Sequence, residues 1–178
     1  YTAWYGCYYF FGENLATPVD RAIKFNDAGL FLSQVQIAVL LLWDIPTGLA
    51  VKVLREPLMV VHHIGFVLTA YYICSSGLNT WYSLCFFGVV EVSSVFVCFA
   101  DVFHPKHPTL NAAEAASPFL QAINGNARIL FGLAFLATRV VYFPYVVGAM
   151  VIPDALAARG GRVSDGALLT TCVCGVLF

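Results

Sequence analysis

The sequence predicts an all-α polytopic membrane protein, a bundle of four complete transmembrane helices with a partial span at each end. Composition and the arrangement of apolar residues lead to this fold class. Of the 178 residues, 60% are hydrophobic and 11% are charged, whereas soluble domains carry about 25% charged residues. The mean hydropathy is +0.81, and the apolar residues gather in long runs. Most of the protein surface is therefore expected to face lipid.

Each predicted span is a helix, because backbone N–H and C=O groups in the hydrocarbon core must find their hydrogen bonds within the segment. A helix needs about 20 apolar residues to cross that core. Two shorter apolar runs, at residues 1–11 and 167–178, are interpreted as partial spans. We expect one domain over residues 1–178, as a piece of a longer chain. The complete spans are expected near residues 28–50, 57–76 and 80–103 and within 119–152.

Prolines and turn residues mark the ends of these helices. Pro57 is expected in a first helical turn, where its missing N–H costs nothing. The sequence Ser-Ser-Gly-Leu-Asn at 75–79 predicts a tight turn, and Pro153 is expected to close the last span. Pro46 and Pro144 lie inside apolar runs. Each predicts a kink or a helix break, because proline removes a backbone donor and clashes with the carbonyl one turn back.

Ionisable residues inside the spans are the candidates for function, because charge is costly to place in lipid. The main ones are Asp44, His62, His63 and Glu91. A rise of about 1.5 Å per residue places Asp44 and the His pair roughly 9 Å below one membrane face. The same count places Glu91 roughly 16–18 Å below it. Polar residues from different helices are therefore expected in one half of the membrane.

Two interpretations of these residues stay open. His62 and His63 are about 100° apart around their helix, so both can line one cleft, and a neutral imidazole suits a general base. A carboxylate on a neighbouring helix, Asp44 or Glu91, would orient that imidazole. Alternatively, Asp44, Glu91, Arg128 and Arg139 pair with one another and with the histidines, and so fix the register of the helices. For Arg139 we expect this structural role.

Neither a metal site nor a nucleic-acid partner is expected, and the predicted partners are membrane lipids. The net charge of −1 provides no basic surface for nucleic acid. Pro105 lies between His104 and His107, and Pro108 follows, so the two histidines cannot share a helical face. With four histidines in all, the chain has too few ligands for the His-rich di-metal sites of membrane oxygenases.

A series of short motifs follows in order along residues 28–152. They are Leu42-Trp43-Asp44, then Val60-Val61-His62-His63-Ile64, then Glu91-Val92-Ser93-Ser94 with Phe96, then Ile123-Asn124-Gly125, and last Phe131, Phe135, Arg139 and Pro144-Tyr145. In order and spacing, the series resembles the TLC-domain family, which is named for its translocation-associated, longevity-assurance and ceroid-lipofuscinosis members.

This resemblance implies a helical membrane protein of lipid metabolism, in the endoplasmic reticulum or another organelle membrane. The family includes ceramide synthases, which join a fatty acyl group from acyl-CoA to a sphingoid base. His62 and His63 match the His pair of those enzymes. Where they carry an Asp-rich motif, this chain has Glu91 followed by Val-Ser-Ser. The sequence is therefore closer to the TLCD-type branch, which is implicated in membrane phospholipid composition.

One function that follows is acyl transfer to a lipid amine or hydroxyl. His62 or His63 would accept the proton of the attacking group, and acyl-CoA would be the cosubstrate. Basic residues in the loops on the same membrane face are expected to attract the phosphates of coenzyme A. These residues are Lys52, Arg55 and Lys106.

The other function is that of a non-catalytic subunit of a larger membrane complex. Such a subunit would pack against lipids, pigments or partner helices. The aromatic share of 15% suits these contacts. We expect the contacting helix faces to bear Phe86, Phe87 or Tyr142.

Overall fold

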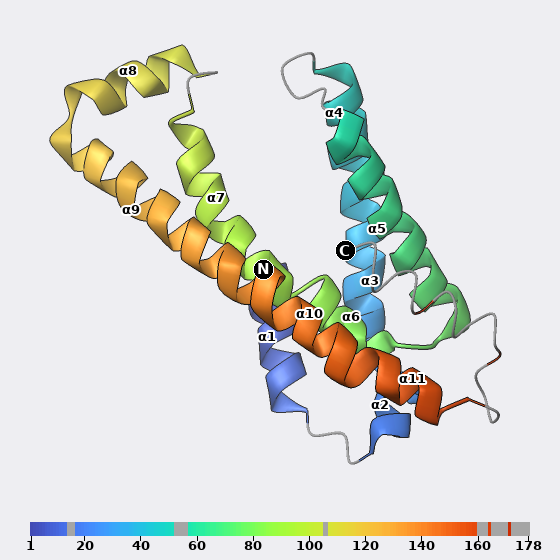
Figure 1. The fold of residues 1–178 in the computed structure, drawn as a ribbon. Coiled ribbons are helices and arrows are strands. Elements are labelled where there is room, and N and C mark those ends of the chain that lie inside the picture. Colours follow the sequence, from blue (N-terminus) through green and yellow to red (C-terminus); the bar gives the residue numbers. More distant parts are fainter. Residues whose placement is uncertain (14–16, 52–56, 105–106, 160–163, 165–170, 172–178) are drawn as a thin grey trace.

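A computed structural model describes residues 1–13, 17–51, 57–104, 107–159, 164 and 171 (Figure 1). These residues are mainly helical and form no β-strand. The predicted partial span at residues 1–11 is helix α1 (Thr2–Gly12), whereas 167–178 lies outside the described residues except for Thr171. The four complete spans are confirmed as helices long and apolar enough to cross a membrane: Pro18–Ala50, Pro57–Ser76, Thr80–Val102 and Pro118–Ala157.

The spans are built from shorter elements. The first contains α2 (Pro18–Ile23), α3 (Asp27–Val39), a π-helix (Leu40–Asp44) and α4 (Ile45–Ala50). The second is α5 (Pro57–Ser76), and the third contains α6 (Thr80–Phe86), a 3-10 turn (Val89–Glu91) and α7 (Val92–Val102). Helix α8 (Pro108–Ala116) precedes the fourth, which contains α9 (Pro118–Phe135), a π-helix (Leu136–Tyr142), α10 (Phe143–Val146), a second π-helix (Val147–Val151) and α11 (Ile152–Ala157).

Polar side chains fix the residues at which several of these helices begin. The side chains of Thr17, Asn26 and Ser117 each accept a hydrogen bond from a backbone N–H in the first turn that follows. Pro18 and Pro118 occupy the first helical position after two of these caps. That position suits proline, because its N–H would have no intrahelical acceptor.

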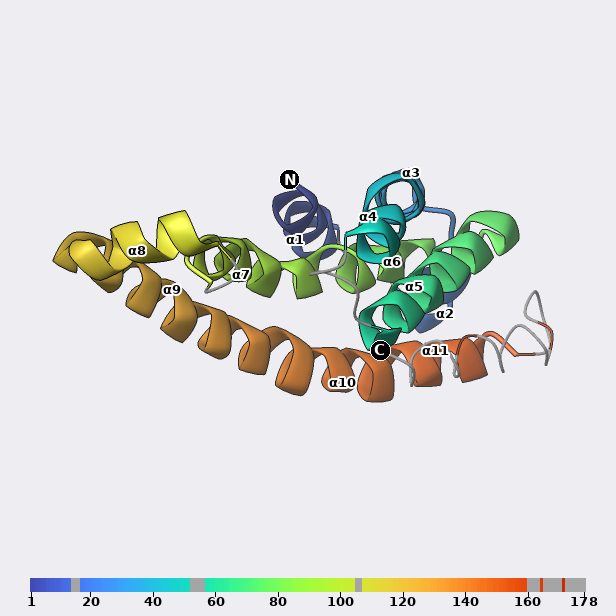
Figure 2. The same ribbon diagram turned by 90° about the horizontal axis from the view of Figure 1, so that it is seen from above.

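The helices form two arms that diverge from a shared base. In Figure 1 one arm consists of α7, α8 and α9, and the other of α3, α4 and α5. Helices α1, α2, α6, α10 and α11 make up the base. Seen from above in Figure 2, the long helix from α9 to α11 runs along one side of the molecule, with α6 and α7 next to it and α1 and α3 behind them. The arrangement leaves the inner faces of the arms opposite each other.

The third span is the centre of the bundle. Its most apolar stretch is 56% buried, against 11–28% for the other spans. All residues from Thr80 to Val90 are buried. Phe86 and Phe87 lie inside this core, at 7% and 0% exposed. The chain's own helices cover these two side chains, and the expected contact of their helix faces with a partner protein stays a prediction.

Small residues allow the helices of the base to approach closely. A Cβ placed on Gly29 of α3 would lie 1.7 Å from the carbonyl oxygen of Thr80. A Cβ on Gly6 of α1 would lie 2.4 Å from the Cα of Gly88. Membrane helices use such contacts because dispersion contacts and hydrogen bonds, and not the expulsion of water, hold them together. The glycines thus set the spacing of α1, α3 and α6.

A buried ion pair joins the first and last spans at the base. Arg21 binds both carboxylate oxygens of Asp154, with Nε–Oδ2 at 2.7 Å and Nη2–Oδ1 at 3.1 Å. The hydroxyl of Tyr82 donates a hydrogen bond to the same carboxylate. Because Asp154 is 2% exposed, its charge is compensated almost entirely by these two side chains. The sequence analysis assigned a role to neither Arg21 nor Asp154.

The helices continue through the prolines of the spans without a break. A π-helix ends two residues before each of Pro46, Pro144 and Pro153. In the π-turns each hydrogen bond reaches one residue further back along the chain than in an α-helix, as from Phe143 N–H to the carbonyl of Thr138. The break considered at Pro144 is absent, and the helix curves gently in Figure 2. Pro153 does not close the last span, because α11 continues to Ala157.

Candidate functional site

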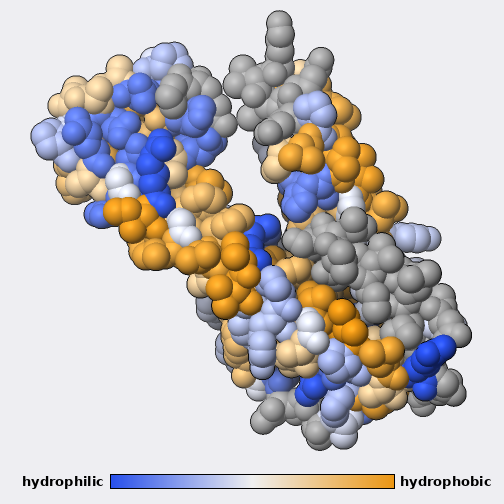
Figure 3. Space-filling model, in the orientation of Figure 1, coloured by the Kyte–Doolittle hydropathy of each residue, from blue (hydrophilic) through white to orange (hydrophobic). Residues whose placement is uncertain are grey.

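A cavity of about 1010 Å³ lies between the two arms. Its walls come from α3 and the π-helix that follows it, from α5, from the 3-10 turn before α7 and α7 itself, and from α9 with its π-helix. The space-filling view in Figure 3 shows the molecule hollowed between the arms on the face drawn. All four membrane spans therefore contribute to this one site.

The four residues predicted as catalytic all line this cavity. His62 and His63 reach it from α5, Asp44 from the end of the first π-helix, and Glu91 from the 3-10 turn before α7. All four side chains are partly buried. The depth count from the sequence had placed them in one half of the membrane, and the fold brings them to one space.

Arg139 also lines the cavity and pairs with Glu91. Its Nη2 lies 3.0 Å from the Glu91 Oε1, and its Nε donates to the Ser93 hydroxyl at 3.2 Å. Both charged side chains are about one quarter exposed, at 26% for Arg139 and 21% for Glu91. The ion pair expected for Arg139 is confirmed. It joins α7 to the last span and holds the Glu91 carboxylate in a fixed position on the cavity wall.

Two of the charged residues at the cavity lie on π-helical turns. Asp44 ends the π-helix before Pro46, and Arg139 lies in the π-helix before Pro144. A π-turn places an extra residue in the turn and so changes the direction in which the following side chains point. In this fold the π-turns before the two prolines therefore help to orient an acidic and a basic side chain toward the same cavity.

His62 has a mixed environment of charge and aromatic surface. Its ring meets that of Phe66 edge to face, with centroids 4.6 Å apart, and the His63 ring is 6.0 Å away. The charges that act on it include those of Glu91 and Arg139. The imidazole thus packs against an apolar side chain in the same cavity as the ion pair, which is an arrangement suited to moving a proton beside an acyl chain.

The rest of the cavity wall is mostly apolar, and the cavity is wide enough for a lipid chain. Aliphatic and aromatic side chains from both arms cover it, and the polar groups gather around the ion pair and the histidines. The apolar residues include Leu58, Ile64, Phe66, Val97, Phe131 and Phe135. An amphiphile could place its polar end at the histidines and its chain along this wall.

Other residues named from the sequence have different outcomes. Lys52, Arg55 and Lys106, predicted to bind coenzyme A phosphates, lie outside the described residues. Asn124 and Arg128 instead bind within the arm: Asn124 donates to Glu114 at 2.6 Å and accepts from Arg128 at 3.0 Å. Gln36 lines the cavity, and only its polarity within an apolar span could have pointed to it beforehand.

Comparison with known sequences identifies the family in which this arrangement of helices and histidines occurs here. A sequence model of the TLC domain matches residues 1–178 of the chain. The chain belongs to the TLC-domain family. No curated protein and no solved structure matches it. Family membership and the four apolar helices together make this TLC domain an integral membrane protein with a lipid-related role.

Proposed function

We propose that this TLC domain transfers an acyl group from acyl-CoA to a lipid amine or hydroxyl in the cavity between its arms. One observation carries the proposal. The four ionisable residues that the family resemblance and the depth count select all line the same largely apolar cavity. Such a cavity offers a proton acceptor at the level where the polar head of an amphiphile meets its chain.

In the proposed reaction His62 is the general base. The lipid nitrogen or oxygen attacks the thioester carbonyl carbon and gives its proton to the imidazole. The C–S bond then breaks, and the thiolate of coenzyme A takes the proton from the His62 imidazolium, so that the products are an amide or ester and free coenzyme A, and the imidazole is neutral again. His62 is chosen over His63 because its ring packs edge to face against Phe66, with ring centroids 4.6 Å apart, and is thereby held at the apolar part of the cavity.

Glu91 is proposed as a positioning residue, since Arg139 at 3.0 Å fixes its carboxylate. Asp44 and His63 are proposed to contact the polar end of the lipid, because they line the same cavity from the other arm. The surrounding apolar side chains would keep water from the thioester. Chemistry of this kind on membrane lipids fits the TLCD-type branch of the family.

The test uses full-length protein in phospholipid vesicles. His62→Ala and His63→Ala are compared with His107→Ala, because His107 is exposed at the start of α8 and lines no part of the cavity. Acyl transfer from a long-chain acyl-CoA to a long-chain amine or a lysophospholipid is followed together with thiol release. We expect His62→Ala to lower transfer at least a hundredfold, in line with the usual contribution of a general base of about 10²–10⁴.

Variants of Glu91 test whether this residue positions the reacting groups or only supports the fold. Glu91→Gln is expected to lower kcat while the KM for acyl-CoA stays unchanged, and Glu91→Asp is expected to restore part of kcat. If both histidine variants fold and transfer as the wild type does, the enzymatic proposal fails. The role of a non-catalytic membrane subunit would then replace it.

A further inference from the structure

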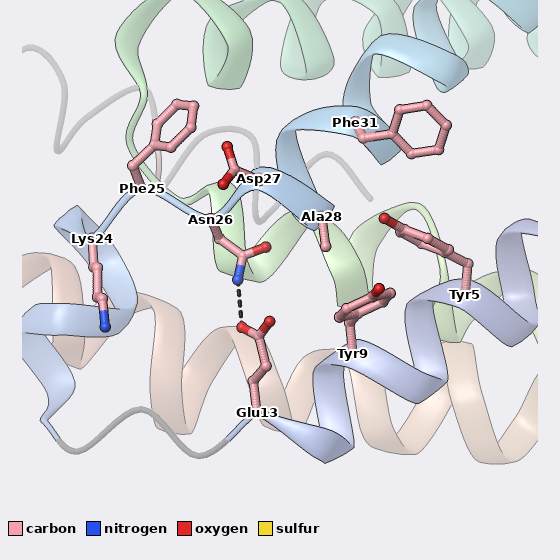
Figure 4. Close-up of a pocket in the computed structure, with 9 residues that line it drawn as sticks. All are labelled: Tyr5, Tyr9, Glu13, Lys24, Phe25, Asn26, Asp27, Ala28 and Phe31. Carbon is pink, nitrogen blue, oxygen red and sulfur yellow. Dashed lines mark hydrogen bonds between the residues drawn. The ribbon is translucent and has the colours of Figure 1, made fainter.

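A second pocket lies at the base of the molecule, at the opposite end from the tips of the arms. It has a volume of about 720 Å³ and is formed by α1, the segment before α3 and the first turn of α3. Figure 4 shows its lining side chains. Those that matter here are the aromatic residues Tyr5, Tyr9 and Phe31 and the charged residues Glu13, Lys24 and Asp27.

The aromatic residues form a continuous wall of the pocket. The centroid of the Tyr5 ring lies 4.6 Å from that of Tyr9 and 5.6 Å from that of Phe31, and in both pairs the ring planes are tilted to each other. In Figure 4 the two tyrosines project from α1 toward α3, and Phe31 closes the same side. The face of an aromatic ring is electron-rich and attracts a cation, including one that cannot donate a hydrogen bond.

The charges around the pocket also favour a cation. Glu13 and Asp27 contribute two negative charges, against one positive charge from Lys24. The amide of Asn26, which is 9% exposed, donates to the Glu13 carboxylate at 2.5 Å and holds it at the pocket. In Figure 4 Lys24 stands on the far side of Glu13 from the aromatic wall. A ligand reaching from the rings to Lys24 would need a positive end and a negative end.

The position of the pocket is that of a lipid headgroup. Asp27 begins α3, whose apolar residues cross the membrane, so the pocket lies where the hydrocarbon core meets water. Tyrosine is enriched at that level of membrane proteins. The pocket thus lies at the end of the molecule opposite the tips of the arms, and α5, the helix that carries His62, extends from the base toward those tips (Figure 1).

We propose that this pocket binds the phosphocholine headgroup of a membrane lipid. The quaternary ammonium would lie against Tyr5, Tyr9 and Phe31 beside Glu13, and the phosphate would lie toward Lys24. The site is separate from the cavity of the His pair, and its ligand does not depend on the acyl-transfer reaction.

Binding is measured on the full chain in an uncharged maltoside detergent, by titration with dihexanoyl phosphatidylcholine or dihexanoyl phosphatidylglycerol. Both lipids carry the phosphate, but only the choline lipid carries a cation. Tyr9→Leu and Phe31→Leu remove aromatic faces, and Tyr8→Leu is the control, because Tyr8 is 62% exposed and outside the pocket. Glu13→Gln removes the charge. Its matched control is Glu114→Gln, because the Glu114 carboxylate also accepts a hydrogen bond from an asparagine amide.

We expect the wild type to bind the choline lipid at least tenfold more tightly than the glycerol lipid. Tyr9→Leu, Phe31→Leu and Glu13→Gln should each weaken that binding about fivefold to tenfold, and both controls should leave it unchanged. Equal affinity for the two lipids would overturn the proposal. So would unchanged choline-lipid binding in Phe31→Leu and Glu13→Gln, which alter partly exposed side chains and so leave the core intact.

Discussion

At the residue scale, two ion pairs with different surroundings connect the spans. The Asp154 side chain is 3% exposed and receives both nitrogens of the Arg21 fork, together with the Tyr82 hydroxyl. The Glu91 and Arg139 pair instead borders the cavity, with about one quarter of each side chain exposed. The first pair is therefore suited to holding the base together, and the second to presenting charge to a ligand.

This difference leads to a prediction for stability. Arg21→Ala leaves the Asp154 carboxylate buried without its counter-charge, and removing one partner of such a pair costs about 3–5 kcal/mol. Tyr82→Phe removes one hydrogen bond to a charged group and should cost about 1.5–3 kcal/mol. The free energy of unfolding in mixed detergent micelles measures both effects. Arg128→Ala, at an exposed arginine of α9, is the control, and an equal loss in Arg21→Ala and Arg128→Ala would contradict the assignment.

At the scale of helices, close contacts between small residues explain how the base is packed. Gly29 leaves no room for a Cβ because the Thr80 carbonyl oxygen is already in its place. Gly132 on α9 has no atom within 4 Å of its Cβ position. The two glycines therefore serve different purposes, although both stand in apolar helices.

Alanine substitutions at these glycines should have opposite effects. Gly29→Ala must push α3 away from α6 and should lower the free energy of unfolding by about 1–3 kcal/mol, as overpacked cores do. Gly132→Ala should raise it by up to about 1 kcal/mol, because alanine favours a helix more than glycine does. Thermal unfolding of both variants in the same detergent tests this. Equal shifts at the two positions would show that the α3–α6 contact does not depend on Gly29.

The π-helix before Pro144 is predicted to control the Glu91–Arg139 pair. Pro144→Ala restores a backbone donor and lets the segment around Arg139 return to α-helical hydrogen bonding, which turns the Arg139 side chain away from its present direction. We expect the coupling free energy of the pair to fall by at least half in the Pro144→Ala background. A double-mutant cycle with Glu91→Gln and Arg139→Gln measures that energy. An unchanged coupling would mean that the π-turn has no part in aiming Arg139.

Sequence reasoning located the spans because each is an apolar run of membrane length, and it located Asp44, His62, His63 and Glu91 because charge is rare in such runs. It did not predict how the helices pass the prolines. Kinks and π-turns both accommodate a missing donor, and the choice between them depends on packing against neighbouring helices. The roles of Arg21 and Asp154 were missed for a similar reason, since their contact joins residues 133 positions apart.

At the scale of the whole molecule, the two arms turn scattered polar residues into one site. The base is held by buried glycine contacts and by the pair of Arg21 and Asp154, whereas the arms leave a cavity of about 1010 Å³ between them. The sequence indicated the depth of the four candidate residues and their likeness to the TLC family. It did not give the cavity, because its walls depend on how far the arms diverge from the base.

The central claim is that this cavity receives a lipid with its polar end at the His pair. A density map of the full-length protein in phospholipid nanodiscs tests it most directly. We predict elongated density between α5 and α7, in contact with Phe66 and Phe135 and ending beside His62. A cavity filled by the protein's own side chains, or by a helix of a partner protein, would contradict the claim.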